Sequence, residues 1–112
     1  MLKPQLYDTI ELITDLPEQT LRAGHRGAIV HQHTDEVFEI EFVGEDGETL
    51  ALCPISSKQF IVVWQAKTEA WVSITDQIAQ IVTNLSEASR AEVRDFAQFL
   101  TVKERSQPLT PA

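Results

Sequence analysis

Three histidines lie close together in the first third of the chain and are its candidates for metal chemistry. His31 and His33 stand two residues apart in a predicted strand, so their side chains are expected on one face of it. His25 precedes them, and Asp35 and Glu36 follow. Zn²⁺ and Ni²⁺ accept imidazole and carboxylate ligands, but a stable site needs a third ligand held in place. We therefore favour exposed polar surface and expect no cofactor, with a metal site of His25, His31 and His33 as the alternative.

Cys53 and the carboxylates of Glu39 and Glu41 are the other groups that could do chemistry. A nucleophilic cysteine needs a base and an oxyanion site. Cys53 instead lies in a predicted apolar strand directly before Pro54, a position that favours a buried and unreactive thiol. Glu39 and Glu41 are predicted to point outward, away from any pocket that could tune two carboxyl groups for acid–base work. Glycine-rich phosphate loops and HExxH motifs are absent from the sequence. The sequence therefore predicts a protein that is not an enzyme.

Acidic residues are concentrated in the first part of the chain. The 112 residues carry 17 acidic and 9 basic side chains, which gives a net charge of −8. Residues 1–65 hold eleven of the acids and four of the bases, and so account for −7 of that charge. Nucleic-acid binding needs clustered Lys and Arg that replace phosphate counterions, so we expect no direct contact with DNA or RNA. The expected partner is a basic protein. The alternative is that the acidic surface binds no partner and only keeps the protein in solution.

The length and the apolar content of 43% are typical of a small soluble protein with one modest core. No apolar run approaches the length of a membrane span, and the first residues lack the apolar stretch of a signal peptide. The lone Cys53 can form no internal disulfide, which agrees with a reducing compartment. We therefore expect a cytoplasmic protein.

Residues 1–65 are predicted to form five short strands. The clearest pattern lies at residues 38–42, where three large apolar residues alternate with Glu39 and Glu41. Gly24 and Gly27 are expected to bracket a turn. The other four strands are expected at residues 8–13, 28–31, 49–53 and 60–64. Five short strands favour a closed five-stranded SH3-like barrel, because closure leaves few open edges, and an open meander with the helices on one face is the competing architecture.

From residue 66 the apolar period changes from two to about 3.6, which predicts helices. Ser73 with Asp76 can cap a first helix, and Ser86 can cap a second. The connection between them is short, so we expect an αα-hairpin over residues 66–105 that packs on itself, on the barrel or on a second copy. The predicted fold is therefore mainly β with C-terminal helices, an α+β arrangement, and residues 106–112 are expected to be a disordered tail.

Two segments resemble known families of small domains. The first covers residues 5–65 and resembles a family of uncharacterised bacterial domains with an SH3-like look. Its resemblance rests on Asp15-Leu16-Pro17-Glu18, Leu21, Gly24, Gly27, Ile29-Val30, Phe38 to Phe42 and Asp46-Gly47. The resemblance implies a fold and a bacterial origin, and it implies no catalytic residue.

The second segment covers residues 73–103 and looks like a family of short, antitoxin-like bacterial helical domains. Its resemblance rests on Leu85-Ser86-Glu87, Glu92-Val93, Asp95-Phe96 and Phe99-Leu100. Ser86 stands where proline is common in that family. The resemblance implies a helical pair that oligomerises or binds a partner.

We expect a non-catalytic protein–protein interaction module, antitoxin-like or regulatory, that binds a basic protein. The candidate contact residues are Glu39, Glu41, Trp64, Trp71, Phe96 and Phe99. Trp64 and Trp71 flank the join between barrel and helices, where filling an internal seam is favoured over acting as an external anchor. Homo-oligomerisation through the helices is a further prediction. The alternatives are an accessory subunit of a larger bacterial complex and a metal-binding protein built on the three histidines.

Overall fold

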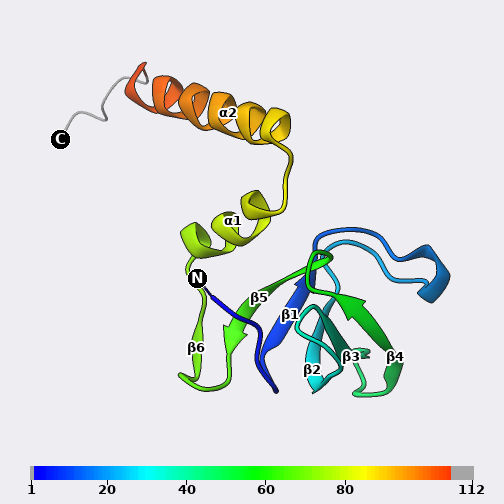
Figure 1. Cartoon of the computed structure of the whole chain (residues 1–112). Coiled ribbons are helices and arrows are strands. Elements are labelled where there is room, and N and C mark those ends of the chain that lie inside the picture. Colours follow the sequence, from blue (N-terminus) through cyan, green and yellow to red (C-terminus); the bar gives the residue numbers. More distant parts are fainter. Residues whose placement is uncertain (1, 107–112) are drawn as a thin grey trace. The chain divides into compact units, whose positions relative to one another are not determined.

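The strands and helices follow the two apolar periods of the sequence. The computed structural model describes residues 2–106 and contains, within them, six strands, one turn of 3₁₀ helix and two α-helices (Figure 1). The elements are β1 (Thr9–Leu12), η1 (Pro17–Gln19), β2 (Arg26–Gln32), β3 (Val37–Val43), β4 (Thr49–Ser56), β5 (Phe60–Gln65), β6 (Ala70–Trp71), α1 (Ile74–Thr83) and α2 (Glu87–Ser106). The predicted α+β class is confirmed.

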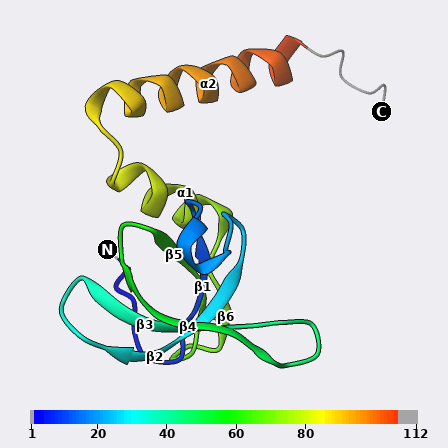
Figure 2. The same ribbon diagram turned by 90° about the vertical axis from the view of Figure 1, so that its right-hand side faces the viewer.

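All six strands belong to one antiparallel sheet in the order β4-β3-β2-β1-β5-β6. This order is open, with β4 and β6 at its edges, so the prediction of a closed barrel is wrong in this respect. Figure 2 shows the β2–β3 and β3–β4 hairpins reaching out on opposite sides of the sheet. The sheet therefore offers two edges and one exposed face to solvent.

The predicted number of strands is also wrong, because β6 follows the five expected strands. β6 pairs with the end of β5 through Trp64 with Trp71 and Gln65 with Ala70. A strand of two residues has no room for a period-two pattern, so its existence depends on tertiary pairing with β5. The region after residue 65 thus begins with a strand before the first helix.

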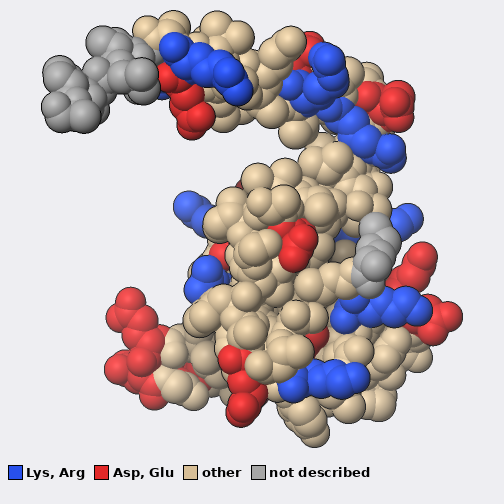
Figure 3. Space-filling model, turned by 90° about the vertical axis from the view of Figure 1, so that its left-hand side faces the viewer, with Lys and Arg blue, Asp and Glu red and all other residues tan. Residues whose placement is uncertain are grey.

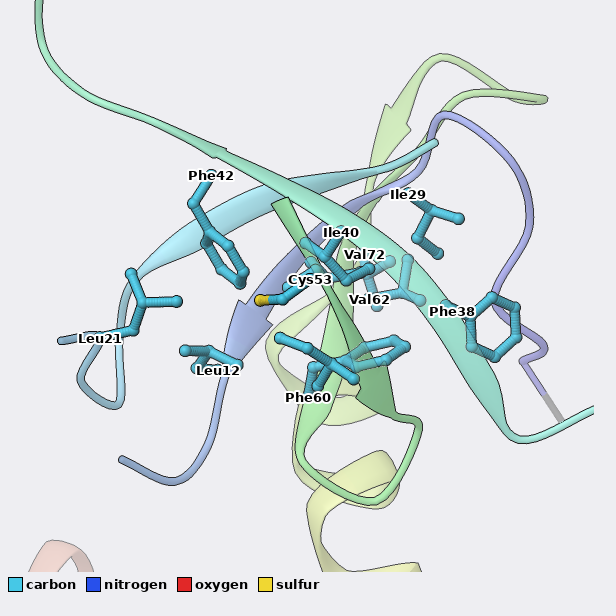
Figure 4. Close-up of a cluster of buried hydrophobic side chains, with 12 residues drawn as sticks. Leu12, Leu21, Ile29, Phe38, Ile40, Phe42, Cys53, Phe60, Val62 and Val72 are labelled. Carbon is cyan, nitrogen blue, oxygen red and sulfur yellow. The ribbon is translucent and has the colours of Figure 1, made fainter. Parts of the chain in front are cut away.

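The core lies on one face of the sheet, and its side chains point toward one another (Figure 4). Phe38, Ile40 and Phe42 are buried as their alternation predicts, and the ring of Phe38 meets that of Phe60 edge to face with 5.8 Å between centroids. The cluster consists of Ile10, Leu12, Leu21, Ile29, Phe38, Ile40, Phe42, Cys53, Ile55, Phe60, Val62 and Val72. Burial of these side chains stabilises the sheet.

Serine caps begin both helices, as the sequence predicts. The Ser73 hydroxyl oxygen accepts a hydrogen bond from the Asp76 amide at 3.1 Å, and that of Ser86 accepts one from the Ser89 amide at 3.1 Å. Each bond satisfies an amide that lacks a partner within its helix. Neither helix within residues 2–106 is long and apolar enough to cross a membrane.

The chain divides into two compact units. The first ends at Ile81 and holds the sheet with most of α1, and the second begins at Val82 and holds α2. Packing of the two helices as a hairpin stays a prediction. The predicted tail begins at Ser106, which is the last residue of α2, and the rest of it lies outside the described residues.

Gln80 of α1 is bonded to the backbone of β5. Its Nε2 donates to the Val62 carbonyl at 2.9 Å, and its Oε1 accepts from the Val62 amide at 2.8 Å. A side-chain amide offers the same donor and acceptor as a peptide group. β6 pairs only with Trp64 and Gln65 of β5, and Gln80 makes with Val62 the two hydrogen bonds that a longer neighbouring strand would make. This contact holds α1 against the edge of the sheet within the first unit.

Replacing Gln80 with alanine is expected to lower the free energy of unfolding by about 2 kcal/mol, because the Val62 amide and carbonyl both lose their partner in a partly buried place. Urea unfolding followed by tryptophan fluorescence measures the change. Gln98→Ala, which changes an exposed glutamine of α2, is the matched control and should cost less than about 0.5 kcal/mol. Equal losses in the two variants would show that the edge contact does not stabilise the sheet.

Candidate functional site

The three histidines do not come together. His25 lies in the turn before β2, where its Nδ1 accepts a hydrogen bond from the Arg22 amide at 2.9 Å. The rings of His31 and His33 meet edge to face, with 4.9 Å between centroids, and His33 Nε2 lies 2.6 Å from Oε1 of Glu39. Within residues 2–106 no group of three or more His, Cys, Asp or Glu side chains is arranged to hold a metal ion. His33 is thus linked to one of the candidate binding carboxylates.

Cys53 is buried in the core side of β4. Burial raises the pKa of its thiol, and the negative charge of Glu39 raises that pKa further. A thiol held in its protonated form is a poor nucleophile at neutral pH, since the thiolate is the reactive species. The environment of Cys53 therefore suits a packing role.

The exposed face of β3 and β4 combines acidic and apolar side chains. Glu39 and Glu41 project from β3 opposite Pro54 and Leu52 of β4, and Val43 is the next outward residue of β3. We define the outer face as Glu39, Glu41, Val43, Leu50 and Leu52. Val43, Leu50 and Leu52 keep between 50% and 56% of their surface exposed. Apolar side chains of this size in one exposed group are typical of a protein contact surface.

Both carboxylates of the outer face are held by neighbours. Glu39 Oε1 lies 2.6 Å from His33 Nε2, and Glu41 Oε2 accepts a hydrogen bond from the Thr49 hydroxyl at 3.0 Å. The carboxylate groups thus have fixed positions beside exposed leucines. Figure 3 shows how acidic side chains gather in places on the strand-bearing part, with basic side chains between them.

A shallow hollow adjoins the outer face over β1, β2 and β3. It has a volume of about 220 Å³ and is bordered by Glu41 and Val43. Its full lining is Thr9, Arg26, Gly27, Ala28, Glu41 and Val43. Ala28 of β2 lies between Thr9 of β1 and Glu41 of β3, and its side chain is only a methyl group, so the surface dips at this place. The hollow is open to solvent.

Arg26 stands at the border of the hollow between an acid and an aromatic ring. Its Nε donates to Glu11 Oε1 at 3.1 Å, and its guanidinium carbon lies 5.5 Å from the centroid of the Trp71 ring. Trp71 keeps 65% of its surface exposed, so the prediction that it fills an internal seam is wrong. Trp64, its partner across β5 and β6, is half-buried. The exposure follows from the place of Trp71 in an edge strand.

The edge of β4 is open only in its first half. Pro54 has no amide hydrogen to offer, and the Ser56 amide is already bonded to Gln59 Oε1 at 3.1 Å. The first half of the strand carries the exposed Leu50 and Leu52. Exposed apolar side chains therefore lie next to the open part of this edge.

Phe96 and Phe99, the remaining predicted contact residues, lie on α2. They keep 61% and 58% of their surface exposed, and their rings stack with 6.1 Å between centroids. They belong to the second compact unit, so they form a candidate surface of their own.

Sequence reasoning missed Val43, Leu50 and Leu52. Val43 continues the outward series of Glu39 and Glu41 by two residues, and that spacing could have identified it. Leu50 and Leu52 alternate with the apolar Ala51 and Cys53, so the pattern of β4 does not tell its outward side from its inward side.

The strand-bearing part of the chain carries a family match. Residues 6–62 match the family described as Domain of unknown function (DUF4926), a range that contains the whole outer face and all three histidines. No curated protein and no solved structure matches the chain. The antitoxin-like resemblance of the helical segment and the bacterial origin stay predictions. The predicted resemblance of the first half to an uncharacterised domain family is confirmed, and the chain belongs to the DUF4926 family.

Proposed function

We propose that the chain is a non-catalytic protein-binding module that docks a basic partner on the outer face of its sheet. The observation that carries the proposal is the exposure of Val43, Leu50 and Leu52 directly beside the carboxylates of Glu39 and Glu41. Protein interfaces combine an apolar centre, which gains from loss of water, with a polar rim that fixes register.

The apolar part of the outer face supplies the affinity. Leu52 lies opposite Glu41 on an edge strand, Leu50 is exposed two residues before it, and Val43 lies on the neighbouring strand near them. A partner that covers all three removes apolar surface from water, and the hollow beside Glu41 receives one protruding side chain.

The acidic part supplies selectivity for a basic partner. Contacts with His33 and Thr49 hold the carboxylates of Glu39 and Glu41 in place, so little ordering is needed when a Lys or Arg approaches. The net charge of −7 over residues 1–65 attracts basic surfaces from a distance and repels acidic ones. An antitoxin-like or regulatory role would follow if the captured partner is a basic, toxic protein, and an accessory role if it is a large assembly.

Charge reversal on the outer face is expected to weaken partner binding at least about tenfold at low salt. Affinity capture from the native host with the full chain, followed by mass spectrometry, identifies the partner, and calorimetry with the purified pair measures affinity. The variant Glu39→Lys plus Glu41→Lys is compared with Glu18→Lys plus Glu69→Lys, which makes the same charge change at exposed positions elsewhere. Leu50→Ser plus Leu52→Ser tests the apolar part.

The wild-type complex should weaken as salt increases, and the Glu39→Lys plus Glu41→Lys variant should lose most of that dependence. The Leu50→Ser plus Leu52→Ser variant should weaken binding with the salt dependence kept. If both outer-face variants bind every captured protein as strongly as the control variant does, the proposed function is wrong.

A further inference from the structure

The second unit exposes an apolar stripe along one long helix. α2 has twenty residues and none of them is buried. Val93, Phe96 and Leu100 follow one another at spacings of three and four residues, as in the seam of a coiled coil, and Ser89 and Lys103 continue this spacing on either side. A single helix gains most of its stability from burying such a face. The stripe thus calls for a second surface that covers it.

We propose that α2 pairs with α2 of a second copy of this chain, in antiparallel orientation. This pairing is independent of the proposed function, because it uses a different compact unit from the outer face. It places Phe96 of each copy against Leu100 of the other at the centre of the pair. Phe99 of one copy then lies beside Phe99 of the other, next to the seam.

Charge complementarity selects a second copy and selects the orientation. In the antiparallel pair Glu92 lies near Lys103 of the second copy, and Arg90 lies near Glu104 of the second copy. Each of these pairs occurs twice because of the two-fold symmetry. A parallel pair would instead set Lys103 against Lys103 within the seam and Phe99 beside Glu104.

The charge of the helix itself does not oppose self-association. α2 contains four acidic and four basic residues, whereas the whole chain carries −8. Figure 3 shows the two kinds of side chain next to each other along α2. Antiparallel helices also set the positive end of each helix dipole beside the negative end of the other. The neutral helix is therefore the part of this acidic chain where two copies can meet with little repulsion.

The mass of the full chain in solution tests the pairing. Sedimentation equilibrium from about 1 µM to about 500 µM covers the range in which a short seam dissociates, and the wild type should pass from monomer to dimer within it. Phe96→Glu should remain a monomer over the whole range, with the far-ultraviolet circular dichroism of the dilute wild type. Gln98→Glu adds the same charge on the side of α2 away from the seam and should still form a dimer.

A charge swap separates a specific pair from loose association. Glu92→Lys and Lys103→Glu should each weaken the dimer about fivefold or more at low salt, and the double variant should regain most of that loss. The swap avoids Arg90, since its Nε also donates to the Leu85 carbonyl at 3.0 Å. No recovery in the double variant would contradict the predicted neighbours.

Disulfide formation reports the orientation. In a Cys53→Ser background, a mixture of Val93→Cys and Lys103→Cys chains should yield mainly the mixed disulfide, since these positions face each other in the antiparallel pair. Disulfides between identical chains only would show a parallel pair and overturn the proposal. A wild type that is monomeric at all concentrations, with Phe96→Glu lowering the stability of the sheet, would show instead that α2 covers its own chain, and would also overturn it.

Discussion

Replacing Asp8 with alanine is expected to lower the free energy of unfolding by about 3 kcal/mol. Asp8 keeps only 2% of its surface exposed, yet both carboxylate oxygens are bonded: Oδ1 accepts from the Ala66 amide at 2.9 Å and Oδ2 from the Gln5 amide at 3.0 Å. Hydrogen bonds to a charged group are worth about 1.5 to 3 kcal/mol each, and alanine leaves both amides without an acceptor. Asp8 thus joins the segment before β1 to the turn after β5.

Two further variants show whether these bonds carry the effect. Asp8→Asn keeps one acceptor oxygen and replaces the other with an NH₂ group, which faces a backbone amide and cannot accept its hydrogen bond. The loss of stability should therefore be at least about half of the loss in Asp8→Ala. Asp15→Ala removes an exposed bond from the Ala23 amide and should cost less than about 1 kcal/mol. Urea unfolding followed by tryptophan fluorescence measures all three, and a loss at Asp15 as large as at Asp8 would contradict the role given to burial.

The sequence allowed the central part of the fold to be predicted because local patterns define it. The alternation in β3 identified the buried Phe38, Ile40 and Phe42, and serine caps identified the starts of α1 and α2. The open sheet and β6 could not be predicted, because contacts between distant residues decide them. The bonds of Gln80 to Val62 are such a contact. They give the Val62 amide and carbonyl the partners that another strand would give them if the sheet closed into a barrel.

The candidate site was predictable in its acidic half only. Glu39 and Glu41 are found outward, as their alternation indicates, although each has a bonding neighbour that spacing does not reveal. The exposed Leu50 and Leu52 lie in a strand that is apolar on both sides, so only the assembled sheet tells which side faces solvent. Exposure of Trp71 likewise depends on its place in the edge strand β6.

Replacing Gly27 with valine is expected to destabilise the sheet by more than about 3 kcal/mol, and replacing it with alanine by about 2 kcal/mol. Gly27 was expected in a turn, but it lies inside β2 opposite Phe42 of β3. A Cβ atom at this position would lie 2.7 Å from the Glu41 carbonyl oxygen and 2.8 Å from Cγ2 of Ile40. The carbonyl belongs to the backbone of β3, so it cannot move aside without straining the pairing of the two strands.

Gly24 provides the control because its backbone conformation favours glycine there, whereas at Gly27 the lack of space does. The φ of Gly24 is 97°, and a Cβ atom there would meet nothing within 4 Å. Gly24→Asn should therefore be milder than Gly24→Ala, since asparagine tolerates positive φ better than alanine does. At Gly27 the order should reverse, because asparagine is larger than alanine and the limit is space. Thermal and urea unfolding of the four variants measure both orders, and the same order at both positions would contradict the close approach of β2 and β3.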